Sequence, residues 1–375
     1  MNPFKIGWVS AAPWLPTGYG QQTGMWCLYF LDQGYDVEIY ATGGLQGGVM
    51  NWNGIPVFPV DDFFDIADLY TVRKCDLLIT LRDVWTINPD ILKEAKVKAA
   101  FWIPVDCDPL GFNDLVMLKR AKATPIAMSR FGRKMLADAG MDALYVPHGI
   151  DTEYFTPGDA REAAGIEDPL TFVIGINATN RDERRKAFEP QLRGFKMFHD
   201  KHPNSVMLLH TLLQDEGLNL ELLINQLDLE ECIGSSDQHM MRTGQIGPAI
   251  VREWYRALSL YSGVSAAEGF GIPLIEAQSC GVPVAANNWA SMPELVADGW
   301  LAEGCIDYNA THAGYWKKPH ADDIANIYEK AYNEWIHPTT WAIRQETARK
   351  FAQRYDVHRV WEKFWKPALA RLEKS

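Results

Sequence analysis

Short apolar runs rich in β-branched and aromatic residues alternate with longer helical patterns along the first half of the chain. Such runs predict strands at residues 6–9, 37–40, 77–81, 99–105, 125–128 and 144–146. Between the first two, Met25, Leu28 and Tyr29 recur at helical spacing over residues 19–33, and Gly34 is a suitable C-terminal cap. Strands that alternate with helices are typical of βαβ units, which build a parallel sheet.

The second half repeats this alternation after a polar pause at residues 146–169. Strands are predicted at residues 171–176, 206–210, 260–264 and 282–285, and helices that begin at Lys186, Pro248, Pro273 and Ser291. After about residue 320 only helical patterns remain, and the last of them contains Trp361, Phe364 and Trp365, which must be buried. We therefore predict two α/β domains, residues 1–168 and 169–345, followed by a helical segment, residues 346–375.

The composition supports two ordered domains. The chain has 375 residues, which exceeds the size that a single hydrophobic core usually supports. Of these residues 47% are hydrophobic and 22% are charged, as in ordered proteins. The six cysteines are scattered without a CxxC pair or zinc-ligand spacing, which predicts reduced thiols in a cytoplasmic protein. The first ten residues lack the features of a signal peptide, and no later stretch approaches the ~20 apolar residues of a membrane span, so we expect no transmembrane segment.

Charge argues against nucleic acid and anionic lipid as general partners, since the formal net charge is -12. One local exception is the stretch 115–137, which has no acidic residue. Its basic residues are Lys119, Arg120, Lys122, Arg130, Arg133 and Lys134. Two interpretations stay open: a solvated helix surface, or an anion-binding surface from Lys119 to Lys134 that would place the protein at the periphery of a membrane or hold an anionic acceptor.

A glycine-containing loop, residues 13–20, follows the first predicted strand and precedes the first helix. Gly18, Tyr19 and Gly20 there would let the backbone approach a ligand, and the helix N-terminus would offer free N–H groups to a phosphate. The alternative is a turn that needs glycine only for a positive φ. The loop fits neither GxGxxG nor a P-loop.

The most informative segment is residues 265–284, where Glu268 and Glu276 stand on either side of a glycine-containing turn. Pro273 suits the first turn of the helix that follows. The exposed amides of residues 271–275 can hold an anion, Glu276 can accept hydrogen bonds from a ribose diol, and Glu268 can face another part of the ligand. The other predicted contacts in this segment are Gly269, Phe270, Gly271, Ile272, Leu274 and Ile275.

This segment resembles the E-x7-E motif of retaining glycosyltransferases of family 4, which have the GT-B fold. Residues 146–157 resemble the linker motif of the same family, residues 17–20 its N-terminal glycine loop, and residues 291–294 its small-residue-x-Pro-Glu segment. The resemblance implies two Rossmann-like domains that face across a cleft: an acceptor-side domain at residues 1–168 and a nucleotide-sugar domain at residues 169–345. It also implies that the C-terminal helix crosses back to the first domain.

The resemblance also suggests residue roles. The family has an Arg and a Lys that grip the donor diphosphate after the first strand of the second domain; Lys186 matches the Lys, whereas Asn180 stands at the Arg position, so that Arg181 or Arg185 would substitute. Many members have a His after the strand at residues 99–105. This chain has Asp106 and Asp108 there.

The implied function is the transfer of a hexose-type sugar, with retention, from a UDP- or GDP-linked donor to an acceptor hydroxyl on a glycan, lipid, protein or modified nucleic acid. No metal or other cofactor is expected, although the Asp106-Cys-Asp108 pattern resembles a metal-binding DxD pair. Two alternatives are a catalytically silent sugar-binding or scaffold protein and a nicotinamide oxidoreductase. The second should have GxGxxG and an acidic residue about 20 positions later, and neither is convincing here.

Overall fold

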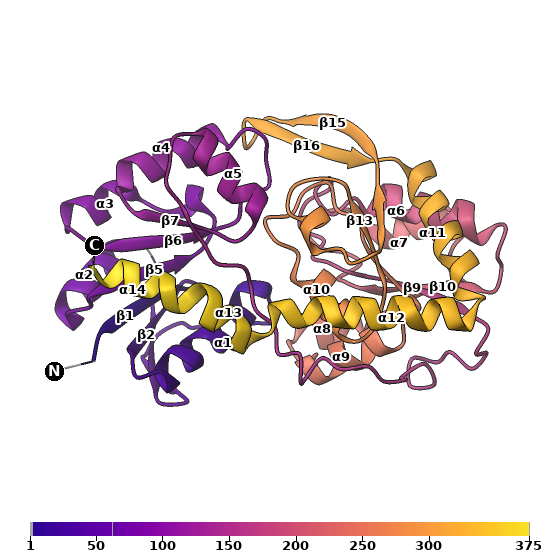
Figure 1. Ribbon diagram of the computed structural model, residues 1–375, viewed down its shortest axis with the longest axis horizontal. Helices are drawn as coiled ribbons and strands as arrows, with labels where there is room; N and C mark the ends of the chain where they lie inside the picture. Colours follow the sequence, from indigo (N-terminus) through magenta and orange to yellow (C-terminus); the bar gives the residue numbers. More distant parts are fainter. Residues whose placement is uncertain (1–2, 62, 375) are drawn as a thin grey trace. The chain divides into compact units, whose positions relative to one another are not determined.

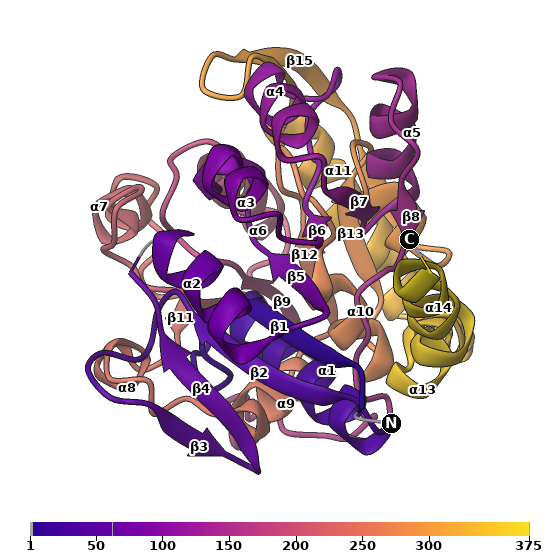
Figure 2. The same ribbon diagram turned by 90° about the vertical axis from the view of Figure 1, so that its left-hand side faces the viewer.

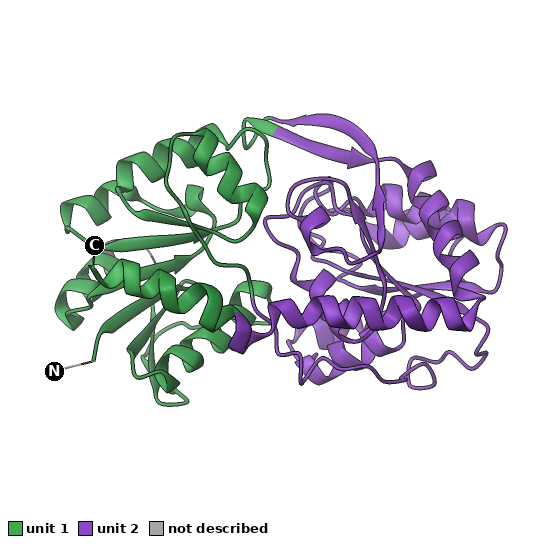
Figure 3. Ribbon diagram, viewed as in Figure 1, with its two compact units in different colours: residues 1–148, 310–314, 360–375 green, residues 149–309, 315–359 purple. Residues whose placement is uncertain are grey.

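The structure, a computed structural model, describes residues 3–61 and 63–374. Residues 1 and 375, the outer limits of the predicted domains, lie outside the described residues. The chain divides into two compact units (Figure 3). Unit 1 consists of Met1–His148, Ala310–Gly314 and Val360–Ser375, and unit 2 consists of Gly149–Asn309 and Tyr315–Arg359. Two short segments from the second half of the chain thus belong to unit 1.

The limits of the units differ from the predicted domain limits. Residues 149–168 belong to unit 2, where the Phe155 carbonyl accepts a hydrogen bond from Ser279 Oγ at 2.6 Å and the Thr156 carbonyl accepts one from Arg256 Nε at 2.7 Å. At the C-terminal end, Trp365 belongs to unit 1. The terminal helices therefore contact the first domain, as the resemblance implied.

Unit 1 contains an eight-stranded sheet in the order β3-β4-β2-β1-β5-β6-β7-β8 (Figure 2). Every neighbouring pair is parallel except β3–β4. The predicted strands of this half are all present, because strands that are buried on both faces have continuous apolar sequences. The strands are β1 (Lys5–Ser10), β2 (Asp36–Ala41), β3 (Met50–Trp52), β4 (Ile55–Pro59), β5 (Leu77–Leu81), β6 (Ala99–Ile103), β7 (Thr124–Ala127) and β8 (Leu144–Tyr145).

Sequence analysis missed the β3–β4 hairpin. Its turn is Asn53-Gly54, with φ of 49° and 87°. Positive φ at both central residues is what a type I′ two-residue hairpin turn requires, and Asn-Gly is the strongest local sequence indicator of it. The hairpin was therefore predictable, although β3 is short and largely exposed.

Helices cover both faces of this sheet (Figure 1). On one face, Val9 and Phe101 share a core with Leu118 of α4 and Met135 of α5. On the other face, Trp102 packs against Trp365 with ring centroids 5.0 Å apart. The helices of unit 1 are α1 (Gly18–Asp32), α2 (Phe63–Arg73), η1 (Val84–Thr86), α3 (Pro89–Glu94), α4 (Phe112–Ala121), α5 (Arg130–Asp138), the π-helical η4 (Trp361–Trp365) and α14 (Lys366–Lys374); α13 (Val357–Val360) spans the change of unit.

The basic residues of the stretch 115–137 lie on α4, at its C-terminal cap Lys122, and on α5, which follows β7. The apolar side of α4 faces the core of unit 1: Leu118 is 1% exposed and Leu115 packs against the same core. These two side chains therefore pack inward and do not provide an apolar surface for lipid beside Lys119 and Arg120. Arg120 forms an ion pair with Asp90, and Lys134 forms one with Asp138 at 2.6 Å.

Unit 2 contains a six-stranded parallel sheet in the order β11-β10-β9-β12-β13-β14 and a separate β15–β16 hairpin. The strands are β9 (Phe172–Asn177), β10 (Ser205–His210), β11 (Ile233–Ser235), β12 (Leu260–Gly263), β13 (Val284–Asn287), β14 (Trp300–Ala302), β15 (Gly304–Asn309) and β16 (Gly314–Pro319). The helices are α6 (Phe188–His199), α7 (Leu220–Gln226), α8 (Gln238–Arg242), α9 (Pro248–Arg256), α10 (Ile272–Ser279), η2 (Met292–Leu295), α11 (Ala321–Trp335), α12 (Pro338–Ala352) and η3 (Gln353–Tyr355). Both units are thus Rossmann-like, as predicted.

Two predicted helices in unit 2 differ from the structure. The helix expected at Lys186 begins at Phe188, because Ala187 has a left-handed backbone with φ of 49° and forms its N-terminal boundary. The helix expected at Ser291 is only the short 3-10 helix η2. The strands β11 and β14–β16 were not predicted, and β11, β15 and β16 contain many polar or exposed residues.

Candidate active site

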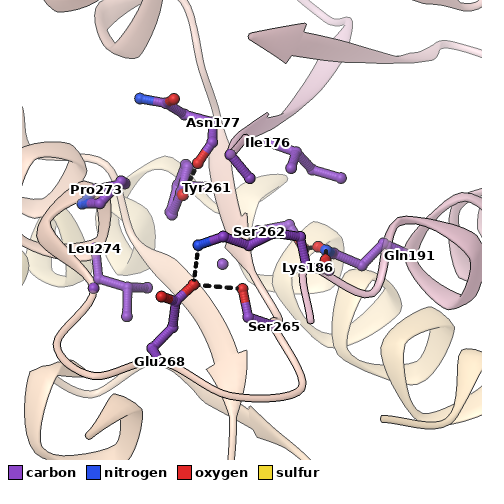
Figure 4. Close-up of a pocket in the computed structure, with 13 residues that line it drawn as sticks. Ile176, Asn177, Lys186, Gln191, Tyr261, Ser262, Ser265, Glu268, Pro273 and Leu274 are labelled. Atoms are coloured by element: carbon purple, nitrogen blue, oxygen red, sulfur yellow. Dashed lines mark hydrogen bonds and ion pairs between the residues drawn. The ribbon is translucent and has the colours of Figure 1, made fainter. Parts of the chain in front are cut away.

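A pocket in unit 2 lies at the carboxyl ends of β9 and β12 and at the start of α10 (Figure 4). Ligands of open parallel α/β sheets bind at this edge, because the strand-to-helix loops gather there. Side chains and backbone from four separate segments meet in it. The lining residues are Ile176, Asn177, Ala178, Lys186, Gln191, Tyr261, Ser262, Gly263, Ser265, Glu268, Gly271, Pro273 and Leu274.

A charged cluster centred on Glu268 forms one wall of the pocket. Lys186 Nζ lies 2.5 Å from Glu268 Oε1, Arg185 Nη1 lies 3.3 Å from Oε2, and Ser265 Oγ donates to Oε1 at 2.7 Å. Burial by itself would raise the pKa of Glu268, but the charges of Lys186 and Arg185 outweigh it, so that the pKa lies below its usual value. Glu268 is therefore an anion that orders two cations beside the pocket.

The backbone of residues 265–271 is fixed by contacts at both ends. Ser291 Oγ lies within hydrogen-bond distance of the carbonyl oxygens of Phe270, at 2.5 Å, and Glu268, at 2.8 Å. Gly271 has φ of 115°, where glycine is strongly favoured, and directly precedes α10. Gly271 and Leu274 line the pocket, whereas Gly269, Phe270, Ile272 and Ile275 are buried and do not line it.

Glu276 lies deeper than the pocket surface and is only 4% exposed. Its Oε2 accepts a hydrogen bond from the Tyr255 hydroxyl at 2.8 Å, and the same hydroxyl accepts one from Asn177 Nδ2 at 2.9 Å. The Tyr261 hydroxyl donates to the Asn177 carbonyl at 3.0 Å. Because Asn177 lines the pocket, this chain of hydrogen bonds joins Glu276 to the wall that contains Glu268.

The basic loop after β9 is divided between structural and site-facing residues. Asn180 is 1% exposed, and its Nδ2 donates to the carbonyls of Leu212 and Leu218 at 3.1 and 2.7 Å. It braces a neighbouring loop, and its side chain is not among those that line the pocket. Arg181 is exposed and lies 3.7 Å from Asp215. Of the two candidate arginines, the structure brings Arg185 to Glu268.

The glycine loop of unit 1 is shaped by its own backbone. The Thr17 side chain caps α1 by accepting a hydrogen bond from the Gly20 amide at 3.1 Å. A Cβ on Gly20 would lie 2.3 Å from the Leu15 carbonyl oxygen, so the loop itself excludes a larger residue. Neither Gly18 nor Gly20 is among the described residues with positive φ, which rules out the alternative explanation for these glycines. Tyr19 donates a hydrogen bond to Asp83 Oδ1 at 3.3 Å.

Asp106 is half-buried after β6 and accepts a hydrogen bond from Cys107 Sγ at 3.3 Å, whereas Asp108 is exposed. Near Asp106, burial raises the pKa of Asp114 to about 6; His312 opposes this shift, and Asp106 and Asp83 add to it. Within residues 3–61 and 63–374, no group of three or more His, Cys, Asp or Glu side chains could hold a metal ion.

Four residues of the site were given no role by the sequence analysis. Tyr255 and Tyr261 are buried aromatic residues, which a sequence assigns to the core by default, and Ser265 is a common loop residue. Asn177 opened the basic segment but was given no role. Polar side chains at the carboxyl ends of predicted parallel strands would have identified Asn177, whereas nothing local marks Tyr255.

In the described part of the chain, no helix is long and apolar enough to span a membrane.

Comparison with known proteins gives three kinds of similarity. The family model for glycosyl transferases group 1 matches residues 218–325. D-inositol 3-phosphate glycosyltransferase of Saccharomonospora viridis is 30% identical over 234 residues, 60% of this chain and 49% of that protein. The corresponding enzyme of Paenarthrobacter aurescens is 25% identical over 195 residues, 51% of this chain and 44% of that protein. The matches thus span less than half the length of these two relatives.

Solved structures resemble the whole chain at low sequence identity. Sucrose-phosphate synthase from Thermosynechococcus elongatus has a TM-score of 0.74 at 16% identity, over 99% of this chain and 100% of that one. Anabaena HepE in complex with UDP and glucose has a TM-score of 0.72 at 19% identity, over 98% and 100% of the two chains. These likenesses show the fold. With the family match and the curated relatives, they show that this chain has the GT-B fold and that its residues 218–325, which contain the motif around Glu268 and Glu276, match the glycosyl transferases group 1 family.

Proposed function

We propose that the protein transfers a hexose-type sugar from a UDP- or GDP-linked donor to an acceptor hydroxyl with retention of anomeric configuration. The observation that supports this most directly is the cluster of Glu268 with Lys186 and Arg185 at the carboxyl edge of the unit 2 sheet. A nucleotide sugar has a diphosphate that needs cations, hydroxyl groups that need carboxylates, and a leaving group whose charge must be neutralised. The cluster offers a carboxylate for the hydroxyls and cations for the diphosphate and the leaving group.

In this proposal each side chain has one role. Lys186 and Arg185 neutralise the diphosphate, and the amides at the start of α10 add hydrogen bonds and the positive end of the helix dipole. Glu268 binds hydroxyls of the donor sugar, and Glu276 binds the ribose diol. Arg185 is preferred to Arg181 because it lies beside Glu268, whereas Arg181 is 66% exposed and faces Asp215.

The reaction exchanges one glycosidic bond for another. The bond between the anomeric carbon and the phosphate oxygen breaks with its electron pair on the nucleoside diphosphate, and the acceptor oxygen bonds to the same face of the sugar. The acceptor proton passes to the departing phosphate oxygen, so no protein nucleophile is needed. Positive charge from Lys186 and Arg185 stabilises that oxygen as its negative charge grows.

Residues of unit 1 are proposed to serve the acceptor. Asp106 stands where many family members have a histidine, and it is half-buried beside Asp114 and Asp83. An acceptor hydroxyl can donate a hydrogen bond to Asp106. We expect Asp106→Asn to change the KM for the acceptor more than the KM for the donor, as measured by initial rates with each substrate varied in turn.

One alternative remains, a sugar-binding protein without turnover, since the family histidine is replaced by aspartate. The nicotinamide oxidoreductase interpretation finds no support, because the matching family model and the curated relatives are glycosyltransferases. Release of nucleoside diphosphate from UDP- and GDP-sugars, screened with glycan, lipid, protein and nucleic-acid acceptors, separates an enzyme from a binding protein. Acceptor-independent binding without any release would contradict the proposal.

The site assignment is tested with matched variants. Glu276→Gln and Lys186→Met each remove one charge-assisted contact, worth about 1.5 to 3 kcal/mol, so donor affinity should fall by about 10- to 150-fold. Lys196→Met is the control, because it breaks a 2.5 Å ion pair with Asp200 on the surface of α6. If donor kinetics are normal in both site variants, the assignment of Glu276 and Lys186 to the donor site is wrong.

A further inference from the structure

The phenol of Tyr255 lies at the centre of a buried hydrogen-bonded chain in unit 2. The residue is on α9, is 0% exposed, and reaches Glu276 on α10. Its hydroxyl donates to Glu276 Oε2 at 2.8 Å and accepts from Asn177 Nδ2 at 2.9 Å. The tyrosine thus has one donor and one acceptor partner, and both partners are fixed to regular secondary structure.

The direction of these hydrogen bonds follows from chemistry. Burial raises the pKa of Tyr255 well above its usual value, and the charge of Glu276 adds to the effect, so the phenol keeps its proton. An amide NH₂ can only donate, which leaves the phenol proton for the carboxylate. A hydrogen bond to one oxygen fixes the plane of a carboxylate that otherwise rotates about its last side-chain bond.

We propose that Tyr255 is a positioning residue for Glu276: it orients the carboxylate toward the ribose hydroxyls and thereby sets the preference of the site for a ribonucleotide donor. The inference rests on the proposed role of Glu276 in binding ribose. Asn177 extends the effect to the pocket, because it both lines the pocket and holds the phenol oxygen. A donor with its diol intact gains from an oriented carboxylate, whereas a donor without hydroxyls gains nothing.

The aromatic ring of Tyr255 has a separate packing role. It contacts Trp254, Tyr261 and Phe155 with ring centroids 5.3, 5.8 and 6.2 Å away. Phenylalanine keeps these contacts and removes only the hydroxyl. Tyr255→Phe therefore separates the orientation of Glu276 from the packing of α9.

The experiment compares UDP and GDP with their 2′,3′-dideoxy analogues, by isothermal titration calorimetry, in the wild type, Tyr255→Phe and Glu276→Gln. We expect the wild type to prefer the ribose form, and Tyr255→Phe to lose about tenfold of that preference, the size of one charge-assisted hydrogen bond. The KM for the donor sugar should rise by a similar factor while kcat stays within about threefold. Affinity for the dideoxy analogue should not change.

Tyr40→Phe is the matched control. Tyr40 is also 0% exposed, and its hydroxyl lies 3.4 Å from a carboxylate oxygen of Glu38, but in unit 1. The Tyr40→Phe variant should leave the ribose preference unchanged. A change in this variant would show that the loss of any buried phenol hydroxyl affects nucleotide binding. If Tyr255→Phe does not fold, Asn177→Leu replaces it: the phenol stays while its amide donor is lost, and the ribose preference should fall by about threefold.

The outcomes separate this inference from the proposed function. Full ribose preference in Tyr255→Phe, or in Asn177→Leu where that variant is used, together with lost preference in Glu276→Gln, overturns the role of Tyr255 alone. Full preference in Glu276→Gln, or none in the wild type, overturns the assignment of Glu276 to the ribose and the inference with it. A lower kcat at unchanged donor KM would show that the tyrosine acts elsewhere.

Discussion

Replacing Glu268 by glutamine should strengthen the binding of a free nucleoside diphosphate and weaken sugar transfer. The change removes one negative charge and keeps the size of the side chain. Glu268 pairs with Lys186 at 2.5 Å and with Arg185 at 3.3 Å, and the side chains of Glu268 and Lys186 are only 14% and 13% exposed. A diphosphate that recruits Lys186 must therefore compete with Glu268 in a site that is poorly screened by water.

The magnitude follows from the hydrogen bonds exchanged. A charge-assisted hydrogen bond contributes about 1.5 to 3 kcal/mol and a neutral one about 1 kcal/mol, so the variant saves roughly 0.5 to 2 kcal/mol when Lys186 turns to the diphosphate. That corresponds to about 2- to 30-fold tighter binding of UDP or GDP. Turnover should fall by about 100-fold or more, because a carboxylate contact to the reacting sugar is lost.

Isothermal titration calorimetry with UDP and GDP measures the first effect, and initial rates of nucleotide release measure the second. Lys186→Met should show the opposite change in affinity, about 10- to 150-fold weaker binding. Urea denaturation of each variant checks that unit 2 stays folded. Weaker nucleotide binding by Glu268→Gln at unchanged stability would refute the competition argument, and an unchanged kcat would remove the contact between Glu268 and the sugar.

Three further predictions concern other groups. The pKa of Asp114 in the folded protein is raised to about 6, so its contribution to stability is fully present below its unfolded-state pKa and is lost as the pH rises toward 6 and beyond. Asp114→Asn should therefore add about 1 to 2 kcal/mol to the free energy of unfolding at pH 7 and nothing near pH 3, as measured by urea titrations at both pH values. EDTA should leave turnover unchanged, because Lys186 supplies the positive charge that a metal ion would bring. A loss of turnover in EDTA that manganese restores would contradict this and show that a metal ion takes part. If the acceptor is anionic, replacing Lys119, Arg120 and Lys122 by Gln should raise its KM and flatten the salt dependence at constant donor affinity; identical curves against ionic strength would mean that these residues are solvated surface.

Local sequence determined the fold class and part of the site. Strands buried on both faces are apolar throughout, which is why β1, β5, β9 and β12 could be predicted from short runs. Glu268 and Glu276 could be singled out because their spacing surrounds a glycine turn at the start of a helix. The β3–β4 hairpin was encoded locally as well, in Asn53-Gly54, and was overlooked.

Tertiary structure decided which polar groups meet. Arg185 and Glu268 are 83 positions apart in sequence, and only the folded sheet brings them to 3.3 Å, which distinguishes Arg185 from Arg181. Asn180 is engaged by the backbone of another loop, and Tyr255 reaches Glu276 from a neighbouring helix. The hydrophobic pattern of a sequence reports which face of each element is buried, because burial is repeated along the element. A single hydrogen bond between distant segments leaves no such repetition, so it is visible only once the elements have packed.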